Sequence, residues 1–260
     1  MRRSTRLRPS LRASVIGAAA FLGLSAGAAA AQPSAFDGGM TAPVSTTDPA
    51  SDRARISAER ATGLRVVVSL EDRRLWVISR SDTLMEAPVA VGTGGRITHL
   101  RRSWTFDTPR GVRTVMRKKV DPVWTPPDWA YVEVAQEHGL ELEHLSARRP
   151  RVLSDGRKLI VRGDVVLLQD ADGFTQEMNR DEHIVFDDIL FVPPTNTVNR
   201  RVEGELGRYA LDTGNGYMLH GTPYQDTIGQ KASHGCLRLR DDDIAWLYDN
   251  VPVGTKVYLY

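Results

Sequence analysis

Short runs of β-branched and apolar residues, each closed by a polar or glycine-containing turn, recur from residue 64 to the end of the chain. Residues 64–70 (LRVVVSL) and 75–79 (LWVIS) flank the polar stretch 71–74 and predict a β-hairpin. Residues 257–260 predict a last strand. A chain built mainly from such runs buries its apolar side chains by packing sheets together.

Apolar residues at helical spacing occur in only two short segments, 130–139 and 244–251. The second segment follows three aspartates at 241–243, which suit a helix N-cap and first turn because negative charge is favourable there. Asn250 and Pro252 predict its end. Many strands with few helices predict a mainly β (α+β) fold, with a β-sandwich or mixed-sheet core and one or two short helices.

The first 31 residues predict a cleaved secretory signal. Five arginines precede an uncharged stretch, 13–31, that is rich in Ala, Gly and Ser around a short apolar centre. Small residues close this stretch, so cleavage after Ala30 or Ala31 fits an export signal. A retained membrane anchor is the alternative, but a spanning helix needs roughly 20 mainly apolar residues and this segment is interrupted by glycine. We therefore expect no stable membrane span after processing.

The rest of the chain is predicted to be a linker followed by one domain. Residues 32–60 are rich in Pro, Gly, Ser, Thr, Asp and Ala and lack apolar periodicity, so we interpret them as a flexible linker. Residues 61–260 are long enough to bury a core as one domain. Within this domain, residues from about 129 to 190 are less regular. They contain a predicted hairpin at 158–169 and are interpreted as an inserted subdomain or cap.

The charge of the chain argues against a nucleic-acid partner. The full sequence has 34 basic and 32 acidic residues, but five of the arginines and none of the acids lie in residues 1–31. The remainder therefore has 29 basic and 32 acidic residues, a net charge of −3. The basic character belongs to the predicted signal, and no electrostatic footprint for nucleic acid remains.

Cys236 is the only cysteine in the chain. An exported protein usually pairs its cysteines, and zinc sites need several clustered ligands, so neither role fits a lone thiol. Such a cysteine is either reactive or buried and inert. The reactive form is the thiolate, and because a free thiol with a pKa of about 8.5 is mostly protonated at neutral pH, a reactive cysteine needs a base nearby.

Two histidines are placed to act as that base. His234 lies two residues before Cys236, and the intervening Gly235 predicts a turn whose backbone N–H groups could bind an oxyanion. His220 lies sixteen residues upstream, and a strand–loop–strand return would bring it beside Cys236. Spacing alone does not choose between the two histidines.

Residues 220–239 (HGTPYQDTIGQKASHGCLRL) resemble the signature of the L,D-transpeptidase (YkuD-type) family. That signature has an upstream His-Gly-Thr, then Ser-His-Gly-Cys, an apolar residue and Asn or Arg. The resemblance includes the Thr-Pro-Arg-Gly turn at 108–111 and covers about residues 64–128 and 190–260. It implies an L,D-transpeptidase-like fold and a cysteine-dependent acyltransferase.

The resemblance also implies roles for individual residues. Cys236 is expected to be the nucleophile and His220 its general base, with the ring of His220 held by the backbone carbonyl of Gly221. His234, Gly235 and Cys236 are expected to supply the turn and the oxyanion-binding N–H groups.

Four further residues are expected to shape the substrate pocket: Ser233, Arg238, Tyr217 and Thr222. The planar fork of Arg238 suits a substrate carboxylate. A surface ion pair with the aspartates at 241–243 is the alternative for this arginine.

By the same resemblance, the expected substrate is the tetrapeptide stem of peptidoglycan, and the expected product is a cross-link or an attached wall-anchored protein. No metal or organic cofactor is needed, and carbapenems are the expected covalent inhibitors. The expected location is the periplasm or cell wall, after secretion across the inner membrane.

Three other functions compete with this one. A carboxypeptidase or endopeptidase of the same fold shares every catalytic residue, so the sequence does not separate it from a cross-linking enzyme. A non-catalytic wall-binding module would keep the fold without the chemistry. A papain-like protease is disfavoured because its cysteine precedes its histidine, whereas here His220 precedes Cys236.

Overall fold

The computed structural model describes residues 48–260. The predicted signal, 1–31, and most of the predicted linker lie outside the described residues. The described part is mainly β, as expected, with three α-helices where one or two were expected. These helices are α1 (Pro49–Arg60), α2 (Asp128–His138) and α3 (Asp241–Asn250), and two short 3-10 helices are η1 (Val198–Arg200) and η2 (Gln225–Thr227).

The largest sheet has five strands in the order β3-β2-β1-β20-β7. Its strands are β1 (Arg65–Ser69), β2 (Arg74–Ser79), β3 (Asp82–Pro88), β7 (Gly111–Thr114) and β20 (Lys256–Leu259). The hairpin predicted at the start of the domain is therefore present as β1 and β2, whose register pairs Val67 with Trp76. The last strand, β20, lies at the interior of the sheet, parallel to β1 and antiparallel to β7.

A second sheet of four strands, in the order β19-β17-β16-β8, carries the segment that contains Cys236. Its strands are β8 (Arg117–Val120), β16 (Tyr209–Asp212), β17 (Met218–His220) and β19 (Leu237–Arg238). Buried side chains of both sheets and of α3 form one apolar core, which includes Val66, Leu75, Leu219, Ile244 and Leu247. The two sheets thus pack over a common core, as the sandwich prediction requires.

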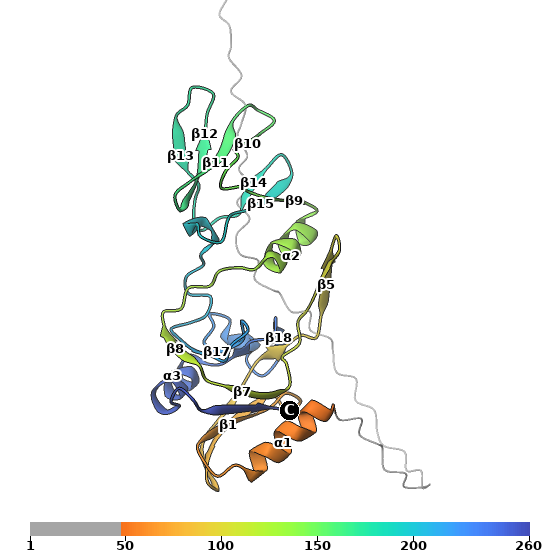
Figure 1. Ribbon diagram of the computed structural model, residues 1–260, viewed down its shortest axis with the longest axis vertical. Helices are drawn as coiled ribbons and strands as arrows, with labels where there is room; N and C mark the ends of the chain where they lie inside the picture. Colours follow the sequence, from red (N-terminus) through yellow and green to blue (C-terminus); the bar gives the residue numbers. More distant parts are fainter. Residues whose placement is uncertain (1–47) are drawn as a thin grey trace, which may run out of the picture.

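Two strand pairs connect these sheets to the rest of the molecule. β4 (Val91–Gly92) pairs in parallel with β18 (Lys231–Ser233), and β5 (Arg96–His99) forms a hairpin with β6 (Arg102–Thr105). In Figure 1 the β5–β6 hairpin projects from the sheets toward α2.

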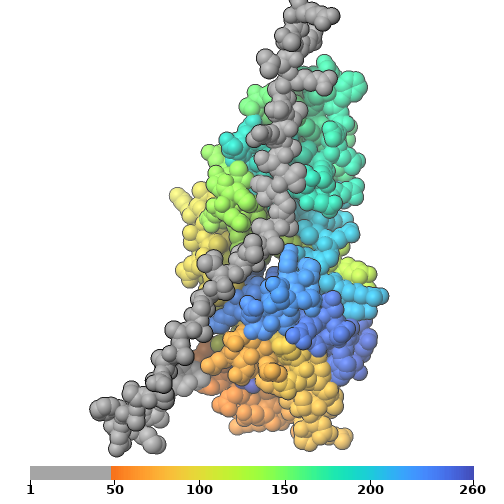
Figure 2. All heavy atoms as spheres, turned by 180° about the vertical axis from the view of Figure 1, so that it is seen from behind, coloured from red at the N-terminus to blue at the C-terminus, as the bar shows by residue number. Residues whose placement is uncertain are grey.

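The region predicted to be an inserted subdomain has its own strands and its own buried cluster. One sheet has the order β10-β11-β12-β13 and the other β14-β15-β9. The strands are β9 (Glu141–His144), β10 (Arg151–Val152), β11 (Lys158–Arg162), β12 (Val165–Gln169), β13 (Thr175–Glu177), β14 (Ile184–Phe186) and β15 (Ile189–Val192). Leu159, Val166 and Phe191 are among its buried side chains. Seen from behind, this subdomain (green to teal) forms one end of the molecule, and the five-stranded sheet lies toward the other (Figure 2).

Helix α1 corrects the interpretation of residues 32–60 as a flexible linker, because residues 49–60 are helical. The carboxylate of Asp48 accepts a hydrogen bond from the N–H of Ala50 at 3.2 Å, and Pro49 occupies the first helical position, where its missing N–H costs nothing. Ala58 packs with Val67 and Tyr258 on the outer face of the large sheet. The buried positions of this helix are alanines and a serine, so its sequence shows no apolar stripe.

None of the helices among residues 48–260 is long and apolar enough to cross a membrane.

Candidate functional site

A short parallel strand pair links the segments of Cys236 and His220: His220 ends β17, and Cys236 directly precedes β19. β17 and β19 pair with Leu219 opposite Leu237 and His220 opposite Arg238. Paired residues of neighbouring strands project to the same face, and the face alternates with each residue. His220 and Arg238 therefore share a face, and Cys236 directly precedes β19. The return across sixteen residues of sequence thus brings the segments of His220 and Cys236 to the same strand pair, where the charge of Arg238 acts on both side chains.

His220 is buried, with 3% of its surface exposed. Its Nδ1 lies 2.5 Å from the carbonyl oxygen of Gly221. Because a carbonyl can only accept, Nδ1 carries the hydrogen, and Nε2 is left with a lone pair. Burial lowers the pKa of His220 to about 4, against the opposing effect of the Gly221 carbonyl, and the positive charge of Arg238 adds to the lowering. The imidazole is therefore neutral at pH 7.

The thiol of Cys236 is also neutral in the resting site. The residue is partly exposed, and its Sγ lies 3.7 Å from the carbonyl oxygen of Gly216. Burial raises the pKa of the thiol, although a hydrogen bond from the backbone of Met218 and the charge of Arg238 act in the opposite direction. Both groups of the expected pair are therefore neutral: the site holds a thiol and an imidazole, not a thiolate and an imidazolium.

A tight turn at Gly235 precedes the cysteine. Gly235 has φ 121°, and a Cβ at this position would lie 2.9 Å from the carbonyl oxygen of Asp107 and 3.0 Å from Cε1 of Tyr217, so only glycine fits. The hydroxyl of Ser233 donates to the carbonyl of Cys236 at 2.6 Å and accepts from the N–H of Gly235 at 3.1 Å. That N–H, expected to bind an oxyanion, here holds the turn.

His234 points toward the inserted subdomain. Its ring stacks on Trp129 with centroids 4.3 Å apart and meets Phe106 edge-on at 4.5 Å. Its Nε2 lies 3.2 and 3.1 Å from the two carboxylate oxygens of Glu133 on α2. The structure therefore separates the two histidines, with His220 buried at the end of β17 and His234 against α2.

The ionic partner of Arg238 is Glu205, not one of the aspartates at 241–243. Its guanidinium lies 4.0 Å from a carboxylate oxygen of Glu205 and donates to the carbonyl of Ala232 at 3.2 Å. The hydroxyl of Tyr224 donates to the other oxygen of Glu205 at 3.3 Å. Burial raises the pKa of Glu205 in spite of the nearby Arg238. The alternative ion pair with the three aspartates is therefore wrong. Those aspartates begin α3, as predicted.

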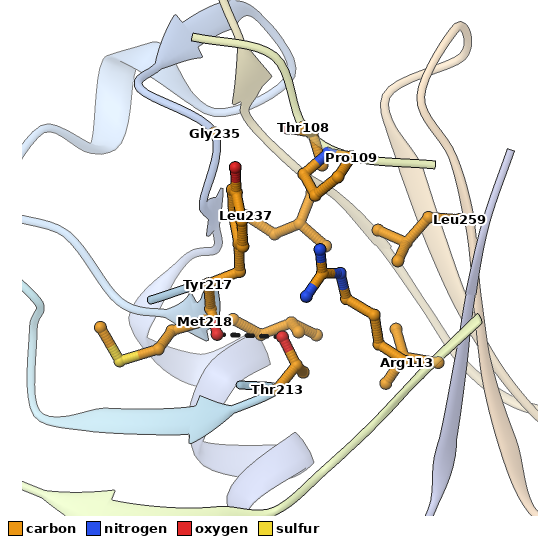
Figure 3. A pocket seen from close by; sticks show the side chains of 11 residues that line it. Thr108, Pro109, Arg113, Thr213, Tyr217, Met218, Gly235, Leu237 and Leu259 are labelled. Atoms are coloured by element: carbon orange, nitrogen blue, oxygen red, sulfur yellow. Dashed lines mark hydrogen bonds between the residues drawn. The ribbon is translucent and has the colours of Figure 1, made fainter. Parts of the chain in front are cut away.

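A narrow pocket lies beneath the Gly235 turn, between the two sheets (Figure 3). Leu219, Leu237, Val257 and Leu259 supply its apolar walls. Tyr217 stands beside the turn, with the Arg113 guanidinium 4.6 Å from its ring centre, and its carbonyl accepts from the hydroxyl of Thr213 at 2.9 Å. The expected pocket residue Tyr217 is thus next to the turn that precedes Cys236.

Thr222 lies in a different place. It is buried, and its hydroxyl oxygen accepts from the N–H of Tyr224 at 3.2 Å. It lines a wider groove together with Gly207, Tyr209 and Asp241 at the start of α3. Tyr217 therefore lines the narrow pocket and Thr222 the wider groove, which are separate sites.

Within residues 48–260, no group of three or more His, Cys, Asp or Glu side chains is placed to hold a metal ion.

The fold and site together define a class: mainly β domains in which a buried histidine ends one strand and a lone cysteine, preceded by a glycine turn, leads into its parallel neighbour. Residues 63–259 match the YkuD family, described as the L,D-transpeptidase catalytic domain, and the chain belongs to that family.

Curated relatives carry the same description. Probable L,D-transpeptidase ErfK/SrfK of Escherichia coli (strain K12) is 29% identical over 197 residues, which are 75% of this chain and 43% of that protein. Probable L,D-transpeptidase YbiS of the same strain is 28% identical over 193 residues, again 43% of its length. The chain thus aligns with less than half of each relative. A solved L,D-transpeptidase from Mycobacterium smegmatis is 17% identical, with a TM-score of 0.38 over 76% of this chain and 58% of that one.

Sequence reasoning missed two acidic residues at the site. Glu205 lies two residues before Gly207, inside a stretch that already resembled the family, so a signal for it was present. Glu133 lies in the region of about 129–190, where the resemblance was weak. Its contact with His234 spans 101 residues of sequence, and no local pattern predicts it.

Proposed function

We propose that this protein is an L,D-transpeptidase that acts on peptidoglycan stem peptides through a thioester on Cys236, with His220 as general base. The observation that carries the proposal is the parallel pairing of β17, which ends at the neutral, backbone-anchored His220, with β19, which directly follows Cys236. Membership of the L,D-transpeptidase family supplies the reaction class.

The neutral pair determines how the reaction begins. As Sγ of Cys236 attacks the carbonyl of the L-centre of diaminopimelate in the stem, Nε2 of His220 takes the thiol proton. The resulting imidazolium, buried and held through Nδ1 by Gly221, returns that proton to the amine of the departing D-alanine. A thioester remains on Cys236. The amine of a second stem, or of a wall-anchored protein, then attacks the thioester, restores the thiol and closes the new amide bond.

Arg238 is the proposed contact for a carboxylate of the stem. Its side chain is held beside the site by the carbonyl of Ala232, and its ionic contact with Glu205 is long, at 4.0 Å. A substrate carboxylate that accepts two parallel N–H bonds from the guanidinium would be a closer partner than Glu205. Tyr217 and the Ser233-anchored turn form the neighbouring wall.

Two other outcomes use the same fold. With water as the acceptor, the same thioester makes the protein an L,D-carboxypeptidase or endopeptidase. A wall-binding module would bind the stem without acylation. Export by residues 1–31 to the periplasm or cell wall is part of the proposal, because peptidoglycan lies outside the inner membrane.

The test is intact-mass spectrometry of the purified protein with a carbapenem, followed by analysis of muropeptide products. We expect one adduct on the wild type, none on Cys236→Ala, and slow formation on His220→Ala. Cross-linked dimers among the products would identify a transpeptidase, and shortened stems alone would identify the hydrolase. A folded wild-type protein that binds stems but forms no adduct would refute the proposed enzymatic activity. The wall-binding module would then be the remaining function.

A further inference from the structure

The inserted subdomain contacts the catalytic segment through one helix. Two side chains one turn apart on α2, Trp129 and Glu133, enclose the ring of His234, the first by stacking and the second by contact of both carboxylate oxygens with Nε2. Both His234 and Glu133 are partly buried, with side-chain exposures of 27% and 34%. His234 precedes the Gly235 turn directly, so its position is coupled through the backbone to that of Cys236.

Helix α2 is itself anchored at several points, so it can act as a fixed support. Asp128, its first residue, pairs with Arg200 at 2.8 Å and with His144 and Arg102 at 3.3 Å each. Farther along the helix, the amide of Gln136 donates to the carbonyl of Thr98 on β5 at 2.7 Å. These contacts fix α2 to η1, to the inserted sheet and to the β5–β6 hairpin.

We propose that Glu133 is a positioning residue of the active site. Its carboxylate accepts the Nε2–H of His234 and fixes the orientation of that ring against Trp129, and the ring in turn fixes the Gly235 turn that sets the position of the Cys236 thiol. The inserted subdomain is on this account part of the catalytic apparatus. This inference rests on the proposed role of Cys236 as nucleophile.

The first experiment compares Glu133→Ala, Glu133→Gln and the control Glu137→Ala, which alters an exposed glutamate one turn farther along α2. The full-length proteins are treated with a carbapenem under pseudo-first-order conditions. We expect the limiting acylation rate of Glu133→Ala to fall about tenfold with little change in the half-saturating concentration, since displacing a reacting group by a fraction of 1 Å has effects of this order. Glu133→Gln keeps an acceptor oxygen and should stay within about twofold of wild type, as should Glu137→Ala.

A double-mutant cycle with His234→Ala shows whether Glu133 acts through that histidine. If it does, adding Glu133→Ala to His234→Ala causes no further loss of rate. Wild-type rates in a folded Glu133→Ala protein, or losses that multiply in the double variant, would overturn the proposal. A lower melting temperature with an unchanged rate would do the same, because it assigns Glu133 a structural role only.

A parallel measurement keeps this inference separate from the proposed function. The rate at which iodoacetamide alkylates Cys236 reports the position and environment of the thiol without acyl transfer. If the wild type forms no carbapenem adduct, the proposed function fails, while a changed alkylation rate in Glu133→Ala and an unchanged one in Glu137→Ala would still support the positioning role. Equal alkylation rates in all three proteins would refute it.

Discussion

Gly207 and Gly221 pack backbone against backbone: a Cβ on Gly207 would lie 2.7 Å from the Cα of Gly221 and 2.8 Å from its carbonyl carbon. The carbonyl oxygen of Gly221 is the group that holds Nδ1 of His220. The contact between these two glycines therefore sets the position of the His220 imidazole.

This contact predicts that Gly207→Ala lowers both stability and reactivity. The added methyl must displace the Gly221 backbone, and alanine is strained at φ 62°, so we expect a loss of about 2–4 kcal/mol in the free energy of unfolding. The control is Gly204→Ala, which has φ 78° with open space around the new Cβ and should cost only about 1 kcal/mol. Denaturant unfolding and carbapenem acylation measure the two effects, and equal behaviour of the two variants would contradict the prediction.

The buried His220 predicts a loss of stability in acid. Its folded pKa of about 4 is below the ordinary value of 6.5, so between these values the unfolded chain binds more protons than the folded one. The stability associated with the neutral ring is complete above pH 6.5 and falls as the pH drops toward 4, by about 3 kcal/mol in all.

Urea unfolding of the wild type and His220→Gln from neutral to acid pH tests this. Both proteins also lose stability in acid as carboxylates such as Asp128 and Asp212 become protonated. Burial raises the pKa of these two carboxyls, but their hydrogen-bond and ionic partners lower it further, so that each pKa is below its ordinary value. The wild type should lose about 3 kcal/mol more. Parallel curves for the two proteins would show that His220 is not buried in its neutral form.

The neutral thiol–imidazole pair predicts different pH profiles for two probes of Cys236. In the proposed mechanism His220 is the base for acylation by a carbapenem, so the acylation rate should rise through about pH 4 and stay nearly constant from about pH 5 to 8. Alkylation by iodoacetamide needs the thiolate, and because burial raises the thiol pKa, its rate should keep rising with pH above neutrality. Alkylation that is independent of pH across this range would indicate a preformed thiolate–imidazolium pair.

The ionic contacts of Asp128 predict that two arginine-to-alanine substitutions lower the free energy of unfolding by unequal amounts. The side chain of Arg200 is only 6% exposed and also donates to the carbonyls of Pro126 and Pro193. Arg200→Ala should therefore cost about 3 kcal/mol, because it leaves one carboxylate oxygen of Asp128 and two carbonyls without the Arg200 donor. Arg102 contacts the same aspartate with a side chain 73% exposed, and Arg102→Ala should cost less than about 0.5 kcal/mol. Thermal unfolding of the two variants measures the difference.

The sequence predicted those parts of the fold whose residues interact locally. The β1–β2 hairpin, the β11–β12 hairpin and helices α2 and α3 have apolar periodicity and turn residues within a short window. Helix α1 was missed because its buried face is alanine and serine, whose small side chains give no apolar stripe. What fixes that helix is its contact with Val67 and Tyr258, and Tyr258 lies about 200 residues away.

The candidate site was predictable only where residue types carry the chemistry. A lone cysteine, a histidine upstream of it and a glycine turn beside it together indicate a reactive thiol, as Cys236, His220 and Gly235 do here. Spacing could not distinguish the surroundings of His220 from those of His234, because these depend on the parallel register of β17 and β19 and on the φ of Gly235. The partners of His234 and Arg238 are acidic residues on distant segments, Glu133 and Glu205, and long-range pairs of this kind leave no pattern in the local sequence.

The interior position of β20 has a consequence for the order in which the domain assembles. β1 is among the first described strands to leave the ribosome, yet its parallel neighbour β20 consists of residues 256–259. Until those residues emerge, β1 and β7 have an unsatisfied edge facing the gap between them, and the large sheet cannot close. Strand pairing across nearly the whole domain has a high contact order, so folding should be slow and should follow, not accompany, synthesis. Such a chain remains unfolded for longer, and an unfolded chain is the form that can be threaded through a narrow channel.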